Sequence, residues 1–277
     1  MINKTVFKTI KFKLAVLILT TIIIAGIAAP LLVPFNPFQP DILHRLQFPG
    51  ATHLFGTDSL GRDLFSRILF GSRYTILLAL LSSLAAVLLG TAIGCLAGYY
   101  GKWPDTIIML LSNIFQGIPG ICFMVAIAGF FGPGLPSLLT ALIITSWVDF
   151  SRIIRTETLK LKGEPFIEGL ICIGCSNRRI IINHIVPNMF SSLLILGTMR
   201  MSRSILSISA LSFLGLGVQP PAPDWSVMVS DALVYYRSYP HLLLIPGGCI
   251  LALIYSLNAV GESLREAFDV RFNEVTR

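Results

Sequence analysis

Residues 163–187 read GEPFIEGLICIGCSNRRIIINHIVP and separate two apolar stretches that are long enough to cross a membrane. The segment mixes glycine, proline and charged residues with apolar ones. Lipid does not tolerate such a mixture, so we expect the segment in water. Pro165 suits the first turn of a helix, and Gly174 interrupts the helical pattern before a second apolar group. We therefore predict two short helices with a bend at Gly174.

The first of these short helices has an apolar face. Because a compact loop in water rarely exposes such a face without a partner, we expect it to dock on another protein. The alternative is that the loop folds back on the membrane helices of its own chain. The face consists of Phe166, Ile167, Leu170 and Ile171, and it is followed by Arg178 and Arg179.

The same segment resembles a known loop. Glu168, Gly174 six residues later, and the run from His184 to Pro187 are similar to the cytoplasmic "EAA" loop of permease subunits of binding-protein-dependent ABC importers. In that family the loop is a coupling helix seated in a groove of the ATPase subunit. This chain has Gly169 and Leu170 where the family usually has two alanines. The resemblance implies an ATPase-coupling role for Phe166, Ile167, Glu168, Leu170, Ile171, Gly174, His184 and Pro187.

The composition is that of a protein embedded in a bilayer. Of the 277 residues, 54% are hydrophobic and 13% are charged, and the mean hydropathy is +0.78. The net charge of +7 does not indicate nucleic acid as a partner, because the basic residues lie at the ends of apolar stretches without interleaved aromatic residues. We expect an all-α polytopic membrane protein, with lipid as a partner and no nucleic acid.

The five cysteines do not predict a disulfide or a metal site. All of them fall in apolar stretches or in the 163–187 loop. Cys172 and Cys175 form a lone CxxC pair without a second pair or histidines at ligand spacing, so a structural role is favoured over zinc or redox chemistry. No metal or cofactor is expected on this chain.

The N-terminal stretch predicts a membrane anchor. Four lysines precede the apolar residues 14–33. A cleaved signal peptide is the competing reading, but the apolar run exceeds a typical signal core, so we favour an uncleaved helix. The polar residues 34–73 then form a loop. We divide the chain into this N-terminal part, residues 1–73, and a permease domain, residues 74–277, that contains the coupling loop.

A second motif lies in that loop. Residues 53–67, HLFGTDSLGRDLFSR, resemble the segment before the second membrane helix in dipeptide, oligopeptide and nickel permeases of the "C" type. The residues themselves predict an interfacial amphipathic helix capped by Asp58 or Ser59, with Arg62, Asp63 and Arg67 on its polar face. Gly56 and Gly61 are spaced as in a phosphate-binding loop, but the lysine and following hydroxyl residue that bind phosphate and magnesium are missing.

The next two membrane stretches each carry a distinctive pattern. Residues 74–100 place Ala86, Gly90, Gly94 and Gly98 on one helix face, where small residues let another helix approach closely. That other helix belongs either to this subunit or to a neighbouring one. Residues 106–131 are broken by Gly117 and Pro119. A broken helix is tolerated in lipid where protein or a water-filled cavity covers it, so this break lines a pathway or is a plain kink.

The fifth membrane stretch, residues 188–211, contains two charges. Arg200 and Arg203 lie three residues apart near its centre, on roughly one face, where an unpaired charge is costly. The fourth stretch is expected to end near Trp147, so no predicted span supplies a carboxylate to pair with them. We expect them to face the translocation cavity and favour anionic groups. The alternatives are a misplaced span or contacts with a neighbouring subunit.

A third motif follows. Residues 211–226, LSFLGLGVQPPAPDWS, are again similar to the "C" type permeases. Asp224 can cap a short helix at the outer interface, with Trp225, Met228, Ala232 and Tyr235 on one side, that packs on the binding protein or anchors the bundle. The sixth stretch covers residues 241–259. With both termini inside, 14 Lys and Arg lie in cytoplasmic segments, 5 outside and 2 within the fifth stretch, as the positive-inside rule requires.

The three motifs occur in the family's order. They imply the permease subunit of an ABC importer with the type I fold of six transmembrane helices, in a bacterial inner membrane. The implied partners are a second related permease, two ATPase subunits that hold ATP and Mg, and an external solute-binding protein. The implied substrates are small peptides or nickel and other metal chelates. This chain would have no catalytic residues of its own.

Two alternatives belong to other classes of protein. A membrane-embedded enzyme would need reactive groups at matching depth, but all four histidines fall in loops or at the ends of apolar stretches. An ATP-independent secondary transporter or channel would leave the coupling loop without a role.

Overall fold

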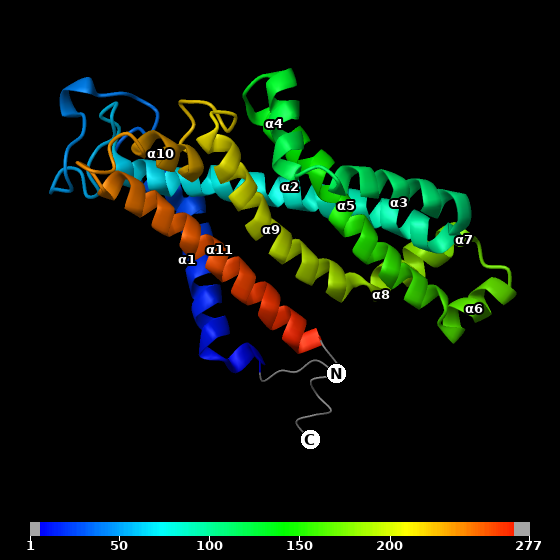
Figure 1. Ribbon diagram of the computed structural model, residues 1–277. Helices are drawn as coiled ribbons and strands as arrows, with labels where there is room; N and C mark the ends of the chain where they lie inside the picture. The colour runs from blue at the N-terminus through cyan, green and yellow to red at the C-terminus, as the bar shows by residue number, and fades with distance from the viewer. Residues whose placement is uncertain (1–5, 269–277) are drawn as a thin grey trace.

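The computed structural model describes residues 6–268, and Figure 1 shows that they fold as a bundle of helices. The described residues form one isolated β-bridge, between Thr57 and Asp63. The elements are η1 (Val6–Lys8), α1 (Ile10–Leu32), η2 (Ile42–His44), α2 (Leu64–Tyr100), α3 (Lys102–Gln116), α4 (Gly120–Phe131), α5 (Leu135–Lys162), α6 (Pro165–Cys172), α7 (Asn177–Ile180), η3 (Ile181–Ile185, a π-helical turn), α8 (Val186–Asn188), α9 (Phe190–Phe213), α10 (Trp225–Ala232) and α11 (His241–Phe268).

The described helices contain four to six candidate membrane spans. Four single helices, α1, α2, α5 and α11, are long and apolar enough to cross a bilayer. Two bent pairs also qualify: α3 with α4 at 86°, and residues 177–188 with α9 at 64°. If each bent pair counts as one span, the number is six. The expectation of an all-α polytopic membrane protein is therefore confirmed.

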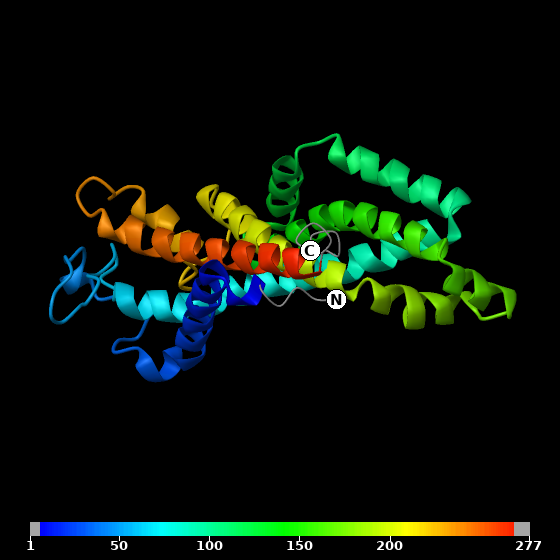
Figure 2. The same ribbon diagram turned by 90° about the horizontal axis from the view of Figure 1, so that it is seen from below.

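Helix α2 is the axis of the molecule. It is 37 residues long, and it contacts α1, α3, α5, α9 and α10. In Figure 1 the loop before α2 and the short helix α10 lie at one end of it, and α6 and α7 lie at the other. Figure 2 shows α3 and α4 on the opposite side of α2 from α1. One continuous helix thus connects the two ends of the protein.

The glycines of α2 pack against α5 of the same chain. A Cβ atom added at Gly90 would lie 2.3 Å from Phe150 Cβ, at Gly94 2.6 Å from the Ser151 carbonyl oxygen, and at Gly98 2.7 Å from the Arg155 carbonyl oxygen. The two helices can approach this closely only because glycine has no side chain. The small-residue face was expected to pack on a helix either of this subunit or of a neighbouring one, and the structure shows it packed on α5 of this subunit.

The start of α2 differs from the prediction. No separate interfacial helix precedes it, because α2 begins at Leu64 and Asp63 is its N-cap, accepting a 2.7 Å hydrogen bond from the Ser66 amide. Arg62 and Arg67 are buried rather than on a polar surface. Both contact Asp58, at 2.7 and 3.5 Å respectively. The boundary that the sequence analysis places between residues 73 and 74, at the start of the permease domain, falls inside helix α2.

Helix α5 is longer than predicted. It continues past Trp147 to Lys162, because its polar residues find partners on α3. The guanidinium of Arg155 donates two hydrogen bonds to the Asp105 carboxylate, and Arg152 donates to the Asn113 side chain. Helix α11 likewise extends to Phe268 instead of ending near residue 259.

Candidate functional site

The 163–187 loop forms two helical segments with a bend, as predicted. Helix α6 ends in a glycine cap in which Gly174 has φ +77°. The Gly174 amide donates to the Ile171 carbonyl at 3.0 Å, and the Cys175 amide donates to the Leu170 carbonyl at 3.0 Å. This pair of bonds is the Schellman arrangement, which favours glycine at the left-handed position. The bend at Gly174 is therefore fixed by hydrogen bonds.

The loop is attached to the membrane helices of its own chain through one side of α6. Ile167 is fully buried, in a cluster with Ile154 of α5 and with Ile180 and Ile185 beyond the bend. Leu170 is half-buried against the same cluster. The prediction that all four apolar residues of α6 are free for a partner is thus wrong for Ile167, and it holds only in part for Leu170.

Three apolar side chains of α6 and its C-cap are exposed. Phe166 is 46% exposed, Ile171 44% and Ile173 79%. We call these three residues the α6 apolar face. Glu168 and Pro187 are exposed and His184 is half-buried. Ile173 was missed by sequence reasoning, because it follows α6 as the C-cap residue, outside the helical pattern.

Further hydrogen bonds fix the loop relative to α2. The Tyr99 hydroxyl donates to the Asn177 side chain at 2.9 Å, and the Lys162 ammonium donates to the Tyr99 carbonyl at 2.6 Å. Tyr99 itself belongs to the buried cluster that holds Ile167. The residues on both sides of α6 are therefore tied to the end of α2.

A second candidate site lies between α5 and α9. A pocket of about 80 Å³ is lined there by charged residues of both helices. It shares three residues with a larger groove of about 740 Å³ that also borders α11. The residues of the smaller pocket are Asp149, Phe150, Ile153, Leu196, Met199, Arg200 and Arg203.

Both predicted arginines face this pocket. Arg200 is half-buried and donates a hydrogen bond to the Ser146 hydroxyl, and its Nε atom has no partner among the described residues. Arg203 is exposed. Both belong to α9, which together with residues 177–188 forms one of the two bent candidate spans.

Asp149 is the residue that sequence reasoning missed. Because α5 continues to Lys162, a carboxylate does lie within a candidate span and lines the same pocket as Arg200 and Arg203. The statement that no span supplies a carboxylate is therefore wrong. The available signal was periodicity: Asp149 follows Ser146 by three residues and precedes Ile153 by four, which places all three on one helix face.

The break between α3 and α4 borders a third hollow. The chain turns by 86° across residues 117–119. A pocket of about 230 Å³ lies there, lined by Pro119, Gly120 and residues of α3, α4 and α5, including Gln116 and Asp149. The Gln116 amide donates to the Asp149 carboxylate at 3.4 Å. The bend at Gly117 and Pro119 thus borders a cavity, and Asp149 lines both this pocket and the α5–α9 pocket.

The opposite end of α2 carries a buried polar network. Asp224 caps α10 as predicted, accepting from the Ser226 amide at 2.9 Å, and it also accepts from the Thr75 hydroxyl of α2 at 2.8 Å. The Trp225 indole donates to the Ile68 carbonyl at 2.9 Å. Asp224 and Trp225 are both buried. Of the predicted face, Trp225, Met228 and Ala232 are buried and Tyr235 is half-buried, so α10 packs on its own chain through that side.

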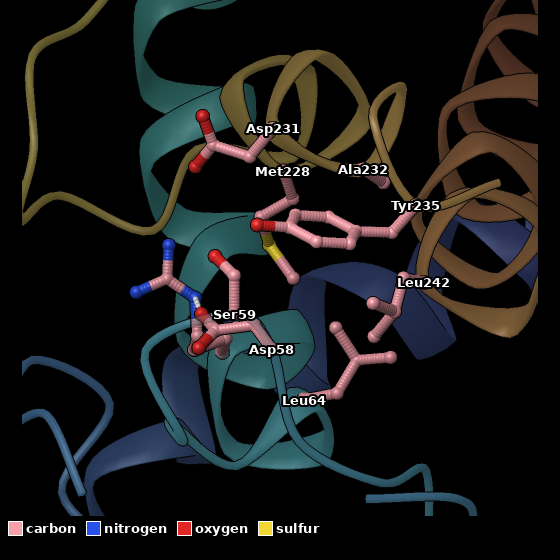
Figure 3. A pocket seen from close by; sticks show the side chains of 9 residues that line it. Asp58, Ser59, Leu64, Met228, Asp231, Ala232, Tyr235 and Leu242 are labelled. Atoms are coloured by element: carbon pink, nitrogen blue, oxygen red, sulfur yellow. Dashed lines mark ion pairs between the residues drawn. The ribbon is translucent and has the colours of Figure 1, made fainter. Parts of the chain in front are cut away.

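A small cavity lies beside this network. Figure 3 shows the carboxylates of Asp58 and Asp231 on one side of it, with Leu64 and Leu242 on the other. Its volume is about 20 Å³, enough for one water molecule. Arg67 lines the same cavity and donates to the Pro37 carbonyl at 3.1 Å. Arg67 therefore joins the N-terminal loop to α2, and the cavity beside it also borders α10.

Replacement of Asp224 by alanine is expected to destabilise the fold. It removes a helix cap, which contributes about 1 kcal/mol, and leaves the buried Thr75 hydroxyl without an acceptor, at a cost of roughly 1–3 kcal/mol. The midpoint of thermal unfolding of the purified protein in detergent should fall by several degrees. Asp41→Ala, at an exposed carboxylate, is the control. Equal midpoints for the two variants would contradict a structural role for the network.

The stability should also depend on pH through Asp224. Burial raises the pKa of Asp224 above its ordinary value of 3.8. The folded state then holds this proton more tightly than the unfolded chain does. The resulting stabilisation is full below pH 3.8 and is lost as the pH rises through the raised pKa. Thermal unfolding from about pH 4 to about pH 7 should show the wild type gaining stability in acid relative to Asp224→Asn. Parallel curves would contradict this assignment.

Together these features define a polytopic helical membrane protein with a charged groove between two spans and, at one end, a tethered loop that presents an apolar face. Residues 90–274 match the family described as the binding-protein-dependent transport system inner membrane component. The chain belongs to this family. It is therefore an ABC importer permease with the type I fold, and a multi-pass inner-membrane protein.

Curated relatives agree with this assignment. The chain is 37% identical to the dipeptide transport system permease protein DppC of Alkalihalophilus pseudofirmus, over 94% of this chain and 86% of that protein. It is also 37% identical to the glutathione transport system permease protein GsiD of Pectobacterium atrosepticum, over 87% of this chain and 80% of that protein. The chain is also 37% identical to the GsiD protein of Escherichia coli, over 92% of this chain and 84% of that protein.

Proposed function

We propose that this chain is the permease subunit of an ATP-driven importer of small peptides. The names of its relatives, a dipeptide permease and glutathione permeases, favour peptides over nickel or other metal chelates. The observation that carries the proposal is the α6 apolar face, which is exposed at the end of a loop fixed to α2 and α5. Such a face is the surface that an ATPase subunit needs in order to act on this chain.

The proposed assembly contains a second, related permease, two ATPase subunits that hold ATP and Mg, and an external solute-binding protein. Both termini and the 163–187 loop lie in the cytoplasm, and the α10 end faces outward. The distribution of Lys and Arg along the chain supports this orientation. In it, the α6 apolar face meets the ATPase, and Asp224, Trp225 and the loop before α2 lie on the side of the binding protein.

The proposed pathway is the groove between α5 and α9, closed by the second permease. Arg200, Arg203 and Asp149 line it, at positions within candidate membrane spans. Charges at that depth are costly unless water or a ligand receives them. The cavity at Gly117 and Pro119 adjoins the groove through Asp149.

The proposed mechanism is a rigid-body switch. Closure of the two ATPases on ATP draws the coupling loops together, and the permeases rock between inward-open and outward-open arrangements. The contact of Gly90, Gly94 and Gly98 with α5 makes α2 and α5 one rigid unit. Since α2 also contacts α10, motion at α6 reaches the far end of the molecule.

Uptake by reconstituted vesicles tests this function. Proteoliposomes with the full complex and the cognate binding protein should accumulate a radiolabelled dipeptide only when ATP is inside with wild-type ATPase subunits. Nickel–histidine chelate is the comparison substrate. Dipeptide uptake without the ATPases would support a channel or secondary transporter instead. ATP-driven uptake of the chelate and not of the dipeptide would show that the substrates are metal chelates rather than peptides.

A further inference from the structure

We propose that the α5–α9 groove binds both charged ends of a free peptide, with Asp149 receiving the α-ammonium group and Arg203, beside Arg200, receiving the terminal carboxylate. This inference rests on the proposed peptide import. It adds a specific site on this chain and a recognised chemical class, the zwitterionic short peptide.

The first support is that these charges are left without ionic partners. Among residues 6–268, neither Asp149 nor Arg203 forms an ion pair. Arg200 donates to the neutral Ser146 hydroxyl, and its Nε atom is buried without a partner. An unpaired charge within a membrane span costs several kcal/mol unless water or a ligand receives it. The groove thus presents one carboxylate and two guanidinium groups to a ligand.

The neighbouring charges on α5 behave differently. Arg155 is paired with Asp105 of α3, and Glu157 with Lys160. The same helix therefore pairs Arg155, Glu157 and Lys160 with opposite charges. Asp149 instead accepts a hydrogen bond from the neutral Gln116 amide at 3.4 Å and has no ionic partner among the described residues.

The position of Asp149 supports a ligand with two charged ends. It lies where the α5–α9 pocket meets the pocket at the α3–α4 break. The arginines line only the first of these pockets, whereas Phe115, Phe123 and Val148 line the second. A peptide ammonium at Asp149 leaves the carboxylate free to reach the arginines and a side chain free to enter the apolar pocket. Charge-assisted hydrogen bonds of this kind are the strong ones.

The site also favours short peptides. Each added residue extends a chain by roughly 3.3–3.6 Å, whereas the pocket that holds all three charged residues has a volume of only about 80 Å³. A long extended peptide cannot keep both its termini in this pocket. The competing explanation is that Asp149 only offsets the charge of Arg200, without touching the ligand.

Equilibrium binding to the complete transporter in nanodiscs, without the binding protein, separates these explanations. The probes are radiolabelled alanyl-alanine, its N-acetyl derivative and its C-terminal amide. Wild-type complex should bind the free dipeptide about tenfold or more tightly than either derivative, as expected for loss of one charge-assisted contact. Asp149→Asn should erase the discrimination against the N-acetyl derivative only. Arg203→Gln should erase the discrimination against the amide only. Asp41→Asn, the same chemical change at an exposed site outside the groove, should keep the wild-type pattern.

This crossed pattern cannot arise from misfolding, which would weaken all three ligands together. The inference is overturned if wild-type complex that imports the dipeptide binds all three ligands equally, or if Asp149→Asn weakens all three alike or leaves the N-acetyl discrimination intact. Failure of the proposed function has a different signature, namely wild-type vesicles with no ATP-dependent uptake of any peptide.

Discussion

Replacement of Gly174 by valine is expected to reduce ATP-driven uptake at least about tenfold while the membrane helices stay folded. Gly174 has φ +77°, a conformation in which a β-branched residue is strongly disfavoured. An added Cβ would meet nothing within 4 Å, so the penalty comes from the backbone alone. It is of the order of 1–3 kcal/mol, and it falls on the bend that orients α6. Since 1.4 kcal/mol corresponds to a factor of ten in population, a small penalty suffices to displace the loop.

Gly174→Asn is the matched variant. Asparagine tolerates the left-handed conformation far better than valine does, so it should keep most of the uptake. Both variants are measured in proteoliposomes for uptake and for ATPase stimulation by the loaded binding protein, with thermal unfolding as the check on folding. If valine supports uptake as well as glycine, the bend is not needed for coupling.

Replacement of Gly94 by leucine is expected to prevent close packing of α2 on α5. Even the first side-chain atom would lie 2.6 Å from the Ser151 carbonyl oxygen and 2.8 Å from Ile154 Cβ. A helix backbone cannot yield locally, so the helices must separate, at a cost of about 3 kcal/mol or more. The yield of monodisperse protein in size-exclusion chromatography and the midpoint of thermal unfolding should both drop sharply.

Gly129→Leu on α4 is the control for Gly94, because an added Cβ there meets nothing within 4 Å. It changes the same residue type within another apolar helix and should leave yield and midpoint near those of the wild type. A Gly94→Leu protein as stable as Gly129→Leu would show that α2 and α5 do not pack as described.

Features set by local backbone chemistry could be predicted from the sequence. The bend at Gly174 needs a residue that accepts a positive φ, and Pro119 has no amide hydrogen with which to continue the hydrogen bonds of α3. The cap at Asp224 needs a short side chain that accepts hydrogen bonds. Each of these requirements is met within a few residues of chain, so the pattern is visible without tertiary structure.

Features set by tertiary contacts could not be predicted. The apolar pattern of α6 identifies a face, but it does not distinguish Ile167, which is buried under the loop, from Phe166, which is exposed. Asp149 was assigned to the water side because charged residues follow it in sequence. The partners on α3 that keep those residues within α5 are some 40 to 50 positions away. Likewise, the burial of Arg62 and Arg67 depends on the loop that precedes α2.

Photo-crosslinking in the assembled complex tests the central claim, that the α6 apolar face is where an ATPase subunit acts on this chain. A photoreactive amino acid is placed at Phe166 or Ile173, and at Leu43 as the control, an exposed apolar residue before α2. We predict crosslinks from Phe166 and Ile173 to an ATPase subunit and none from Leu43. Crosslinks from Phe166 and Ile173 only to this chain's own helices would contradict the account.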